Sequence, residues 1–207
     1  MSTRLQTARQ ERDTLLMSGP PALRRQTGAQ AGGAALLSPL LALHRVLSSS
    51  TASVDPALDH VRRLCRATGR RLEDLVDVDD APTVSLLVSR FIEPDLLPLC
   101  DVLASFLGPA ARARFADADA NNDDLKDLGD AVAAVVEEDL GPALLSLGLF
   151  TFEVPRPFVT LFDPRRHQLV ERGSGPKDVV VDVQRFGRVE QGRRLKEPAL
   201  VVVGGGT

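Results

Sequence analysis

The chain has 207 residues, of which 43% are hydrophobic and 26% charged, a composition typical of a globular protein with an apolar core. Its net charge is -3, so no overall positive charge attracts nucleic acid or an anionic membrane. Tyr and Trp are absent, which removes the aromatic platforms that commonly stack single-stranded nucleic acid. We therefore expect neither nucleic acid nor membrane as a partner.

The first 33 residues predict a flexible N-terminal segment. A possible short helix over residues 3–17 is followed by the aperiodic stretch "SGPPALRRQTGAQAGG". The most apolar run, "AALLSPLLALHRVL", is interrupted by Pro39 and reaches His44 and Arg45, whereas a membrane span needs about 20 apolar residues. The polar start is unlike a secretory signal. We expect a cytoplasmic protein.

Residues 34–92 predict an atypical helical region. In "DPALDHVRRLCRATG", apolar residues recur every three or four positions, Pro56 suits the first helical turn, and Gly69 is expected to end the helix. Cys65 and Cys100 both fall in such helical patterns, so we expect buried free thiols and no disulfide framework.

Residues 93–149 predict a helix bundle. Leucines and valines form wide apolar stripes over residues 95–107 and 123–147, and Pro142 is expected to kink the second helix. Such stripes are wider than a small β module covers, which favours a dimer interface. The alternative is packing within one chain against helices 34–91.

The pattern changes at Phe150. Alternating and β-branched segments ("FTFEV", "VVVDV", "ALVVV") separated by turns predict a small β domain over residues 150–207. Five of the eight Phe lie between Phe150 and Phe186 and are expected to fill its core. Helices followed by strands predict an α+β fold rather than a doubly wound sheet.

Sites of chemistry are weakly indicated. The acidic loop "DADANNDD" lacks the Gly and Glu of a calcium loop, and no Cys/His spacing fits zinc, so we expect no metal. Asp163 and His167 are candidates for a hydrolytic dyad, but no nucleophile elbow accompanies them. A structural corner is the favoured interpretation, with Asp163 capping a turn that Pro164 opens. We expect neither an enzyme nor a cofactor.

Charge is unevenly distributed. Residues 165–196 hold nine Lys or Arg against four Asp or Glu, an excess of five positive charges on an acidic chain. A cationic module of this kind suits docking on an acidic protein surface, although a solvated face without a partner gives the same pattern.

The spacing of motifs in the last 110 residues resembles GrpE, the nucleotide exchange factor of Hsp70-type (DnaK) chaperones. The elements that carry the resemblance are Phe162-Asp163-Pro164, His167, Val170, Gly187, Gly192, Leu195-Lys196 and the strand "ALVVV". Upstream, "DLLPLCDVL" is similar to the stretch that opens the family's helical bundle. Residues 1–92 hold too many Pro and Gly to form the family's long N-terminal rod.

The resemblance implies a homodimeric co-chaperone of protein folding and the stress response. One C-terminal wing domain would bind the nucleotide-binding domain of an Hsp70-type chaperone and promote ADP release. By position in the motif, the expected contacts are Gln184, Arg185, Gly192, Arg193 and Val202. The residues expected to shape the wing are Phe162, Asp163, Pro164, His167 and Gly187. The alternative is an adaptor that docks on a specialised Hsp70-like ATPase without promoting exchange.

Overall fold

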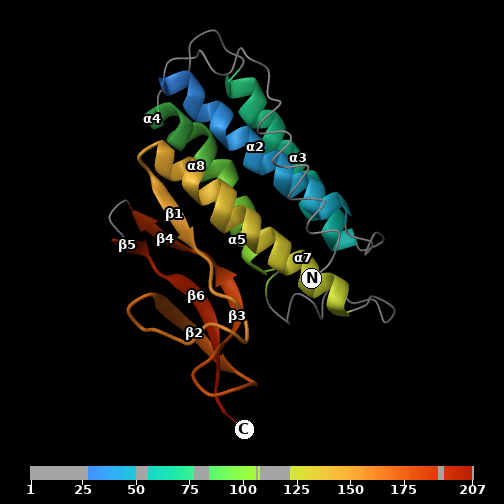
Figure 1. Cartoon of the computed structure of the whole chain (residues 1–207), viewed down its shortest axis with the longest axis vertical. Coiled ribbons are helices and arrows are strands. Elements are labelled where there is room, and N and C mark those ends of the chain that lie inside the picture. The colour runs from blue at the N-terminus through green and yellow to red at the C-terminus, as the bar shows by residue number, and fades with distance from the viewer. Residues whose placement is uncertain are drawn as a thin grey trace.

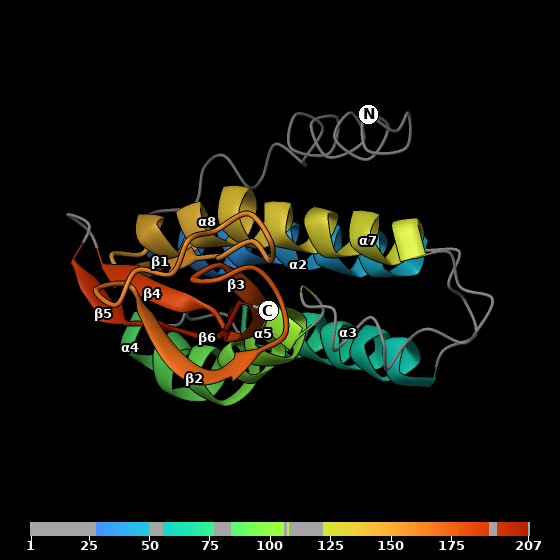
Figure 2. The ribbon, with the colours of Figure 1, turned by 90° about the horizontal axis from the view of Figure 1, so that it is seen from below.

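The computed structural model describes residues 28–49, 56–76, 84–105, 107, 122–190 and 194–206. Among the described residues, every helix lies before residue 147 and the strands begin at Phe150, so the predicted α+β class and the change at Phe150 are confirmed. The helices lie together on one side, and the strands form a β module beside them (Figure 1). Viewed from below, the β module covers one end of the helical layer (Figure 2).

Two helices open the described chain and pack against each other: α2 (Gly28–Ser49) and α3 (Pro56–Val76). Their contact faces follow from helical spacing, because Leu36, Leu40, Leu43 and Leu47 of α2 are almost fully buried. Leu58, Val61, Cys65 and Leu72 are the corresponding residues of α3. Arg62 strengthens the pairing, since its Nε donates to the carbonyl of Leu47 at 2.7 Å.

Two boundaries differ from the sequence prediction. Residues 28–33 belong to α2, which continues through Pro39, rather than to a flexible segment. The second is Gly69, where α3 does not end but continues to Val76. Here the apolar face on both sides of Gly69 is buried, and burial outweighs the low helix propensity of one glycine. The other residues of the predicted flexible segment, 1–27, lie outside the described residues.

Two longer helical rods complete this half, and each contains a π-helical stretch. The first is built from α4 (Val84–Leu87), η2 (Val88–Leu96) and α5 (Leu97–Ser105). The second consists of α7 (Asn122–Val135), η3 (Val136–Leu140) and α8 (Gly141–Ser146). The wider π turns precede or surround Pro94 and Pro142, whose rings remove backbone donors from the helical ladder.

The apolar stripes of these rods are buried inside the chain. Leu99, Leu103, Val132 and Leu144 have no exposed surface. The second rod packs on α2 and β1, whereas α5 packs on α3 and β3. Intramolecular packing therefore accounts for the described residues of both stripes, and the width of the stripes no longer supports a dimer interface. The homodimer stays a prediction without this basis.

The β module consists of two three-stranded sheets. One has the order β1 (Phe150–Glu153), β4 (Gly187–Glu190), β5 (Leu195–Glu197) and is antiparallel. In the other, β6 (Ala199–Gly204) lies between β2 (His167–Gly173) and β3 (Val180–Arg185). Strand β6 pairs parallel with β2 and antiparallel with β3. All valines of β3 and β6 are buried. Val180, Val183, Val201 and Val203 belong to the core that includes the helices, whereas Val181 and Val202 lie close to Gly173.

A single core joins the helices to the β module. Phe150, Phe152 and Phe186 lie in it, and their rings meet edge to face at 5.5 and 6.0 Å. The expectation that Phe residues fill the β core is confirmed for these three and wrong for Phe158, which is 50% exposed.

The two cysteines are buried and free, as the sequence predicts. Cys65 lies in α3 and Cys100 in α5. Burial raises the pKa of the Cys65 thiol to about 12 and also raises that of Cys100. Neutral thiols of this kind act as small apolar side chains in the core.

Candidate functional site

The Asp-Pro turn joins the two sheets at the start of β2. The carbonyl of Asp163 accepts hydrogen bonds from the backbone amides of Arg166 at 3.0 Å and His167 at 2.8 Å. Its carboxylate accepts from the amide of Arg165 at 2.9 Å. Pro164 occupies the position where its fixed φ favours such a turn. Asp163 thus caps the turn that Pro164 opens.

His167 is the buried centre of this turn, with only 4% of its surface exposed. Its Nδ1 accepts the backbone amide of Asp163 at 3.1 Å, so the neutral ring carries its proton on Nε2. That nitrogen lies 3.4 Å from Oε1 of Glu153, which also binds Nε of Arg166 at 2.8 Å. Phe162 packs beside the imidazole with ring centres 6.0 Å apart.

This arrangement does not form the hydrolytic dyad considered from the sequence. The Asp163 carboxylate binds a backbone amide, and the acid facing the imidazole is Glu153. The contacts instead connect β2 to the end of β1, which is a structural role.

Gly187 is the first residue of β4 and pairs with Glu153 of β1. A Cβ at this position would meet the amide nitrogen of Ala199 at 3.0 Å and the Cβ of Glu153 at 3.1 Å. The same carboxylate residue that faces His167 therefore approaches Gly187. Phe162, Asp163, Pro164, His167 and Gly187 all lie around the contact between the two sheets.

The predicted partner contacts are distributed unevenly. Gln184 is exposed on β3, and Arg185 beside it is partly buried, with Nη2 3.9 Å from Glu197. Val202 is 6% exposed and lies in the central strand β6, so its side chain packs inside the module. As a partner contact, Val202 stays a prediction. Gly192 and Arg193 lie outside the described residues.

Charged side chains gather where α5 packs on the β module. Arg185 and Arg188 both approach Glu197, which Arg188 contacts through Nη2. Asp101 of α5 lies near these two arginines. Burial raises the pKa of its carboxyl group, while the positive charges of Arg185 and Arg188 lower it. Arg185 is thus engaged within the chain.

An exposed apolar ridge, formed by Phe158, Val159 and Leu161, lies on the β module. These side chains are 50%, 78% and 70% exposed. Phe158 has a φ of +62°, a strained value for a residue with a side chain. Its amide donates to Val180 at 2.7 Å, which holds the turn against β3.

Arg156 anchors this ridge to the helices. Its Nη2 binds Glu137 of η3 at 3.0 Å, and its backbone amide donates to Thr160 Oγ1 at 2.7 Å. The ridge is therefore held in place by contacts to both the helices and β3.

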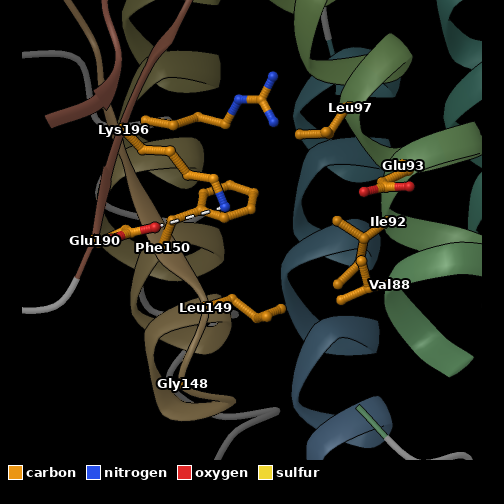
Figure 3. Close-up of a pocket in the computed structure, with 10 residues that line it drawn as sticks. Val88, Ile92, Glu93, Leu97, Gly148, Leu149, Phe150, Glu190 and Lys196 are labelled. Atoms are coloured by element: carbon orange, nitrogen blue, oxygen red, sulfur yellow. Dashed lines mark ion pairs between the residues drawn. The ribbon is translucent and has the colours of Figure 1, made fainter. Parts of the chain in front are cut away.

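A pocket of about 350 Å³ lies between the helical half and the sheet β1–β4–β5. Figure 3 shows Val88, Ile92, Glu93 and Leu97 on one wall, with Leu149, Phe150, Glu190 and Lys196 opposite. Arg188 and Gly148 complete the lining. The first wall is the π-helical stretch η2 with the start of α5.

Both signs of charge meet in this pocket. The ammonium of Lys196 lies 6.0 Å from the Phe150 ring centre and 3.6 Å from Oε1 of Glu190, the pair marked in Figure 3. The guanidinium of Arg188 lies 5.7 Å from the same ring centre. Glu93 makes no ion pair with any residue that the structure describes.

No sequence motif predicts this pocket. Its walls come from residues 88–97 and 148–196, which are distant along the chain and share no motif. The available signal was the position of Phe150 at the helix-to-strand change, with two cations on strands that pair near it.

Within the described residues, no group of His, Cys, Asp and Glu side chains is arranged to hold a metal ion. Most of the acidic loop weighed as a calcium site, residues 117–121, lies outside them. None of the helices in these ranges is long and apolar enough to cross a bilayer.

No protein family, curated protein or solved structure shows significant similarity to the chain.

Proposed function

We propose that this protein is a GrpE-like co-chaperone. Its β module would bind the nucleotide-binding domain of an Hsp70-type chaperone and promote release of ADP. The observation that carries the proposal is the turn from Phe162 to His167, in which the residues of the family motif contact one another. Gly187, from a distant part of the same motif, adjoins Glu153 at this contact.

Two surface features support a docking role. The apolar ridge of Phe158, Val159 and Leu161 offers contact area, and Gln184 is exposed on β3, the strand against which the ridge turn is held. The excess of positive charge over residues 165–196 complements an acidic partner. The proposed contacts are Gln184, Arg185, Gly192, Arg193 and Val202. Arg185 is limited by its pairing to Glu197.

The proposed mechanism is allosteric and makes no bond. A partner that binds the open form of a nucleotide cleft more tightly than the closed form must weaken nucleotide binding. By linkage, nucleotide weakens the partner to the same extent, and a coupling of about 3 kcal/mol corresponds to roughly 150-fold in affinity. No titrating side chain or cofactor takes part.

The test is the release of labelled ADP from an Hsp70 of the same organism. We expect release to accelerate when the protein is added at micromolar concentration. Release that stays unchanged with every Hsp70 of that organism would remove the exchange-factor proposal.

The helical half favours one alternative, an adaptor without exchange activity. Helices α2 and α3 pack on each other and on α5, α7 and α8, which differs from a long rod that extends from the β module. Such a half is suited to recruit another protein while the β module docks on an Hsp70-like ATPase. Binding of the chaperone without faster ADP release would distinguish this adaptor.

A further inference from the structure

We propose that the pocket between η2 and the sheet β1–β4–β5 binds a small zwitterion with an apolar body, such as an apolar amino acid or dipeptide with free termini. This proposal is independent of the co-chaperone function. It depends on the lining of the pocket and on the placement of charge across it.

The pocket has the dimensions of a small-molecule site. Its volume of about 350 Å³ lies at the lower end of the range of roughly 300–1,000 Å³ found for ligand pockets. That space suits a ligand of amino acid or dipeptide size. One wall is π-helical, and such irregular helix turns occur frequently at functional sites.

The two walls supply apolar surface from both sides. Val88, Ile92 and Leu97 come from the helices, while Leu149 and Phe150 come from the helix-to-strand junction (Figure 3). An aliphatic or aromatic side chain placed between them would be removed from water on both faces.

The charges define the polar ends of the ligand. Lys196 and Arg188 lie on the sheet wall and retain donors beyond their pairs with Glu190 and Glu197, so they suit a carboxylate. Glu93 lies on the helix wall without an ion pair among the described residues, so it suits an ammonium group. The ligand's carboxylate would face the sheet and its ammonium the helix.

A dianion fits this lining less well than a zwitterion. Two carboxylates, Glu93 and Glu190, balance the two cations, so the lining carries no net positive charge to hold a phosphate. A zwitterion pairs with both walls and adds no net charge.

The test measures binding of leucine and leucyl-leucine to the full chain by calorimetry and by saturation-transfer NMR. Two blocked probes separate the termini: N-acetyl-leucyl-leucine lacks the ammonium, and leucyl-leucinamide lacks the carboxylate. We expect each blocked probe to bind about tenfold more weakly than leucyl-leucine. The bound dipeptide should also raise the melting temperature of the chain, because only the folded state forms the pocket.

Two variants test which wall of the pocket binds the ammonium of the ligand and which binds its carboxylate. Glu93→Gln should weaken leucyl-leucine about tenfold and leave the acetylated probe unchanged. Lys196→Met should weaken leucyl-leucine similarly and leave the amide unchanged. Matched controls at exposed positions outside the pocket, Glu73→Gln and Lys177→Met, should not alter binding. All four positions are exposed, so each variant is expected to keep the fold, which its melting curve checks.

Three results would overturn the proposal. One is the absence of binding for both zwitterions at concentrations up to roughly 10 mM. Another is equal binding of the blocked and free probes, which would show that the pocket does not recognise the ammonium and carboxylate groups of the ligand. The third is unchanged affinity in folded Glu93→Gln and Lys196→Met, which would place the ligand elsewhere.

Discussion

Two hydrogen bonds of opposite direction join Asp163 and His167. The amide of Asp163 donates to Nδ1 of His167 at 3.1 Å, and the amide of His167 donates to the carbonyl of Asp163 at 2.8 Å. The imidazole thereby closes a turn whose backbone connects β1 to β2.

Replacement of His167 by Ala should lower the free energy of unfolding by about 2–4 kcal/mol. The change leaves a cavity beside Phe162 and an unpaired amide on Asp163. Urea unfolding followed by circular dichroism measures the loss. Gln168→Ala, at the exposed neighbouring position, serves as the control and should stay within about 0.5 kcal/mol. Equal effects of the two changes would contradict the structural role of His167.

Two glycines should respond in opposite directions to Ala. At Gly204 a Cβ would lie 2.0 Å from the carbonyl oxygen of Pro176, a backbone atom, so Gly204→Ala should cost about 3 kcal/mol or more. At Gly69, within α3, nothing lies within 4 Å of the added atom. Gly69→Ala should therefore stabilise by about 0.5–1 kcal/mol through helix propensity. Denaturant midpoints of both variants test the signs.

Substitution of Val132 by Asp distinguishes a core from an interface. Val132 has no exposed surface within one chain, so a buried carboxylate there should unfold the protein, with a loss of about 4 kcal/mol or more. Asp127→Asn, an exposed change on the same helix, should leave the fold intact. Circular dichroism with light scattering is the measurement. A folded monomer produced from a dimer would show instead that this face is an interface.

Stability should fall when the pH is lowered through the range in which His44 titrates. Arg66 Nε donates to His44 Nε2 at 3.3 Å, and burial, followed by Arg66 and Arg62, lowers the pKa of His44 from its ordinary 6.5. The unfolded chain then binds the proton more readily than the folded chain. The contribution is fully present above pH 6.5 and is lost as the pH falls through the lowered value. Since His44 is partly exposed, we expect less than about 1 kcal/mol.

Denaturant unfolding at pH 7.5 and at pH 5.5 measures this difference. His44→Gln keeps an acceptor for Arg66 but does not titrate, so the difference should shrink in that variant. A difference that persists unchanged in His44→Gln would assign it to other groups.

The charge reversal Arg193→Glu tests the proposed docking contact. It should reduce the acceleration of ADP release by about tenfold, because a cation that meets an acidic surface becomes an anion. Lys126→Glu, which makes the same charge change at an exposed position of α7, is the matched control and should have a much smaller effect. If Arg193→Glu promoted release as well as the unchanged chain, the contact assignment would be wrong even with the function correct.

Periodicity predicted most of the fold. The spacing of leucines in α2 and α3 and the alternation after Phe150 follow from which faces are buried, so they are visible in the sequence. Single residues that disfavour helix were poor guides to where the helices end. Pro39 lies inside α2 and Gly69 inside α3, because long-range packing maintains both helices.

The candidate sites also differ in whether they depend on local sequence or on long-range packing. The turn at Asp163 and His167 depends on residues four positions apart, so its geometry follows from a local motif. The burial of Val202 depends on β6 becoming the central strand, and the pocket depends on Glu93 facing Lys196 across a hundred residues of chain. Neither the burial of Val202 nor the pocket has a local signature in the sequence. Phe158 is also exposed in a strained backbone conformation, although Phe usually lies in the core.

Strand β6 holds its sheet together, because it lies between β2 and β3. It pairs parallel with β2 and antiparallel with β3, and those two strands do not pair with each other. A protease that removed β6 would therefore leave both neighbours as unpaired edges, the kind of exposed backbone on which chains aggregate.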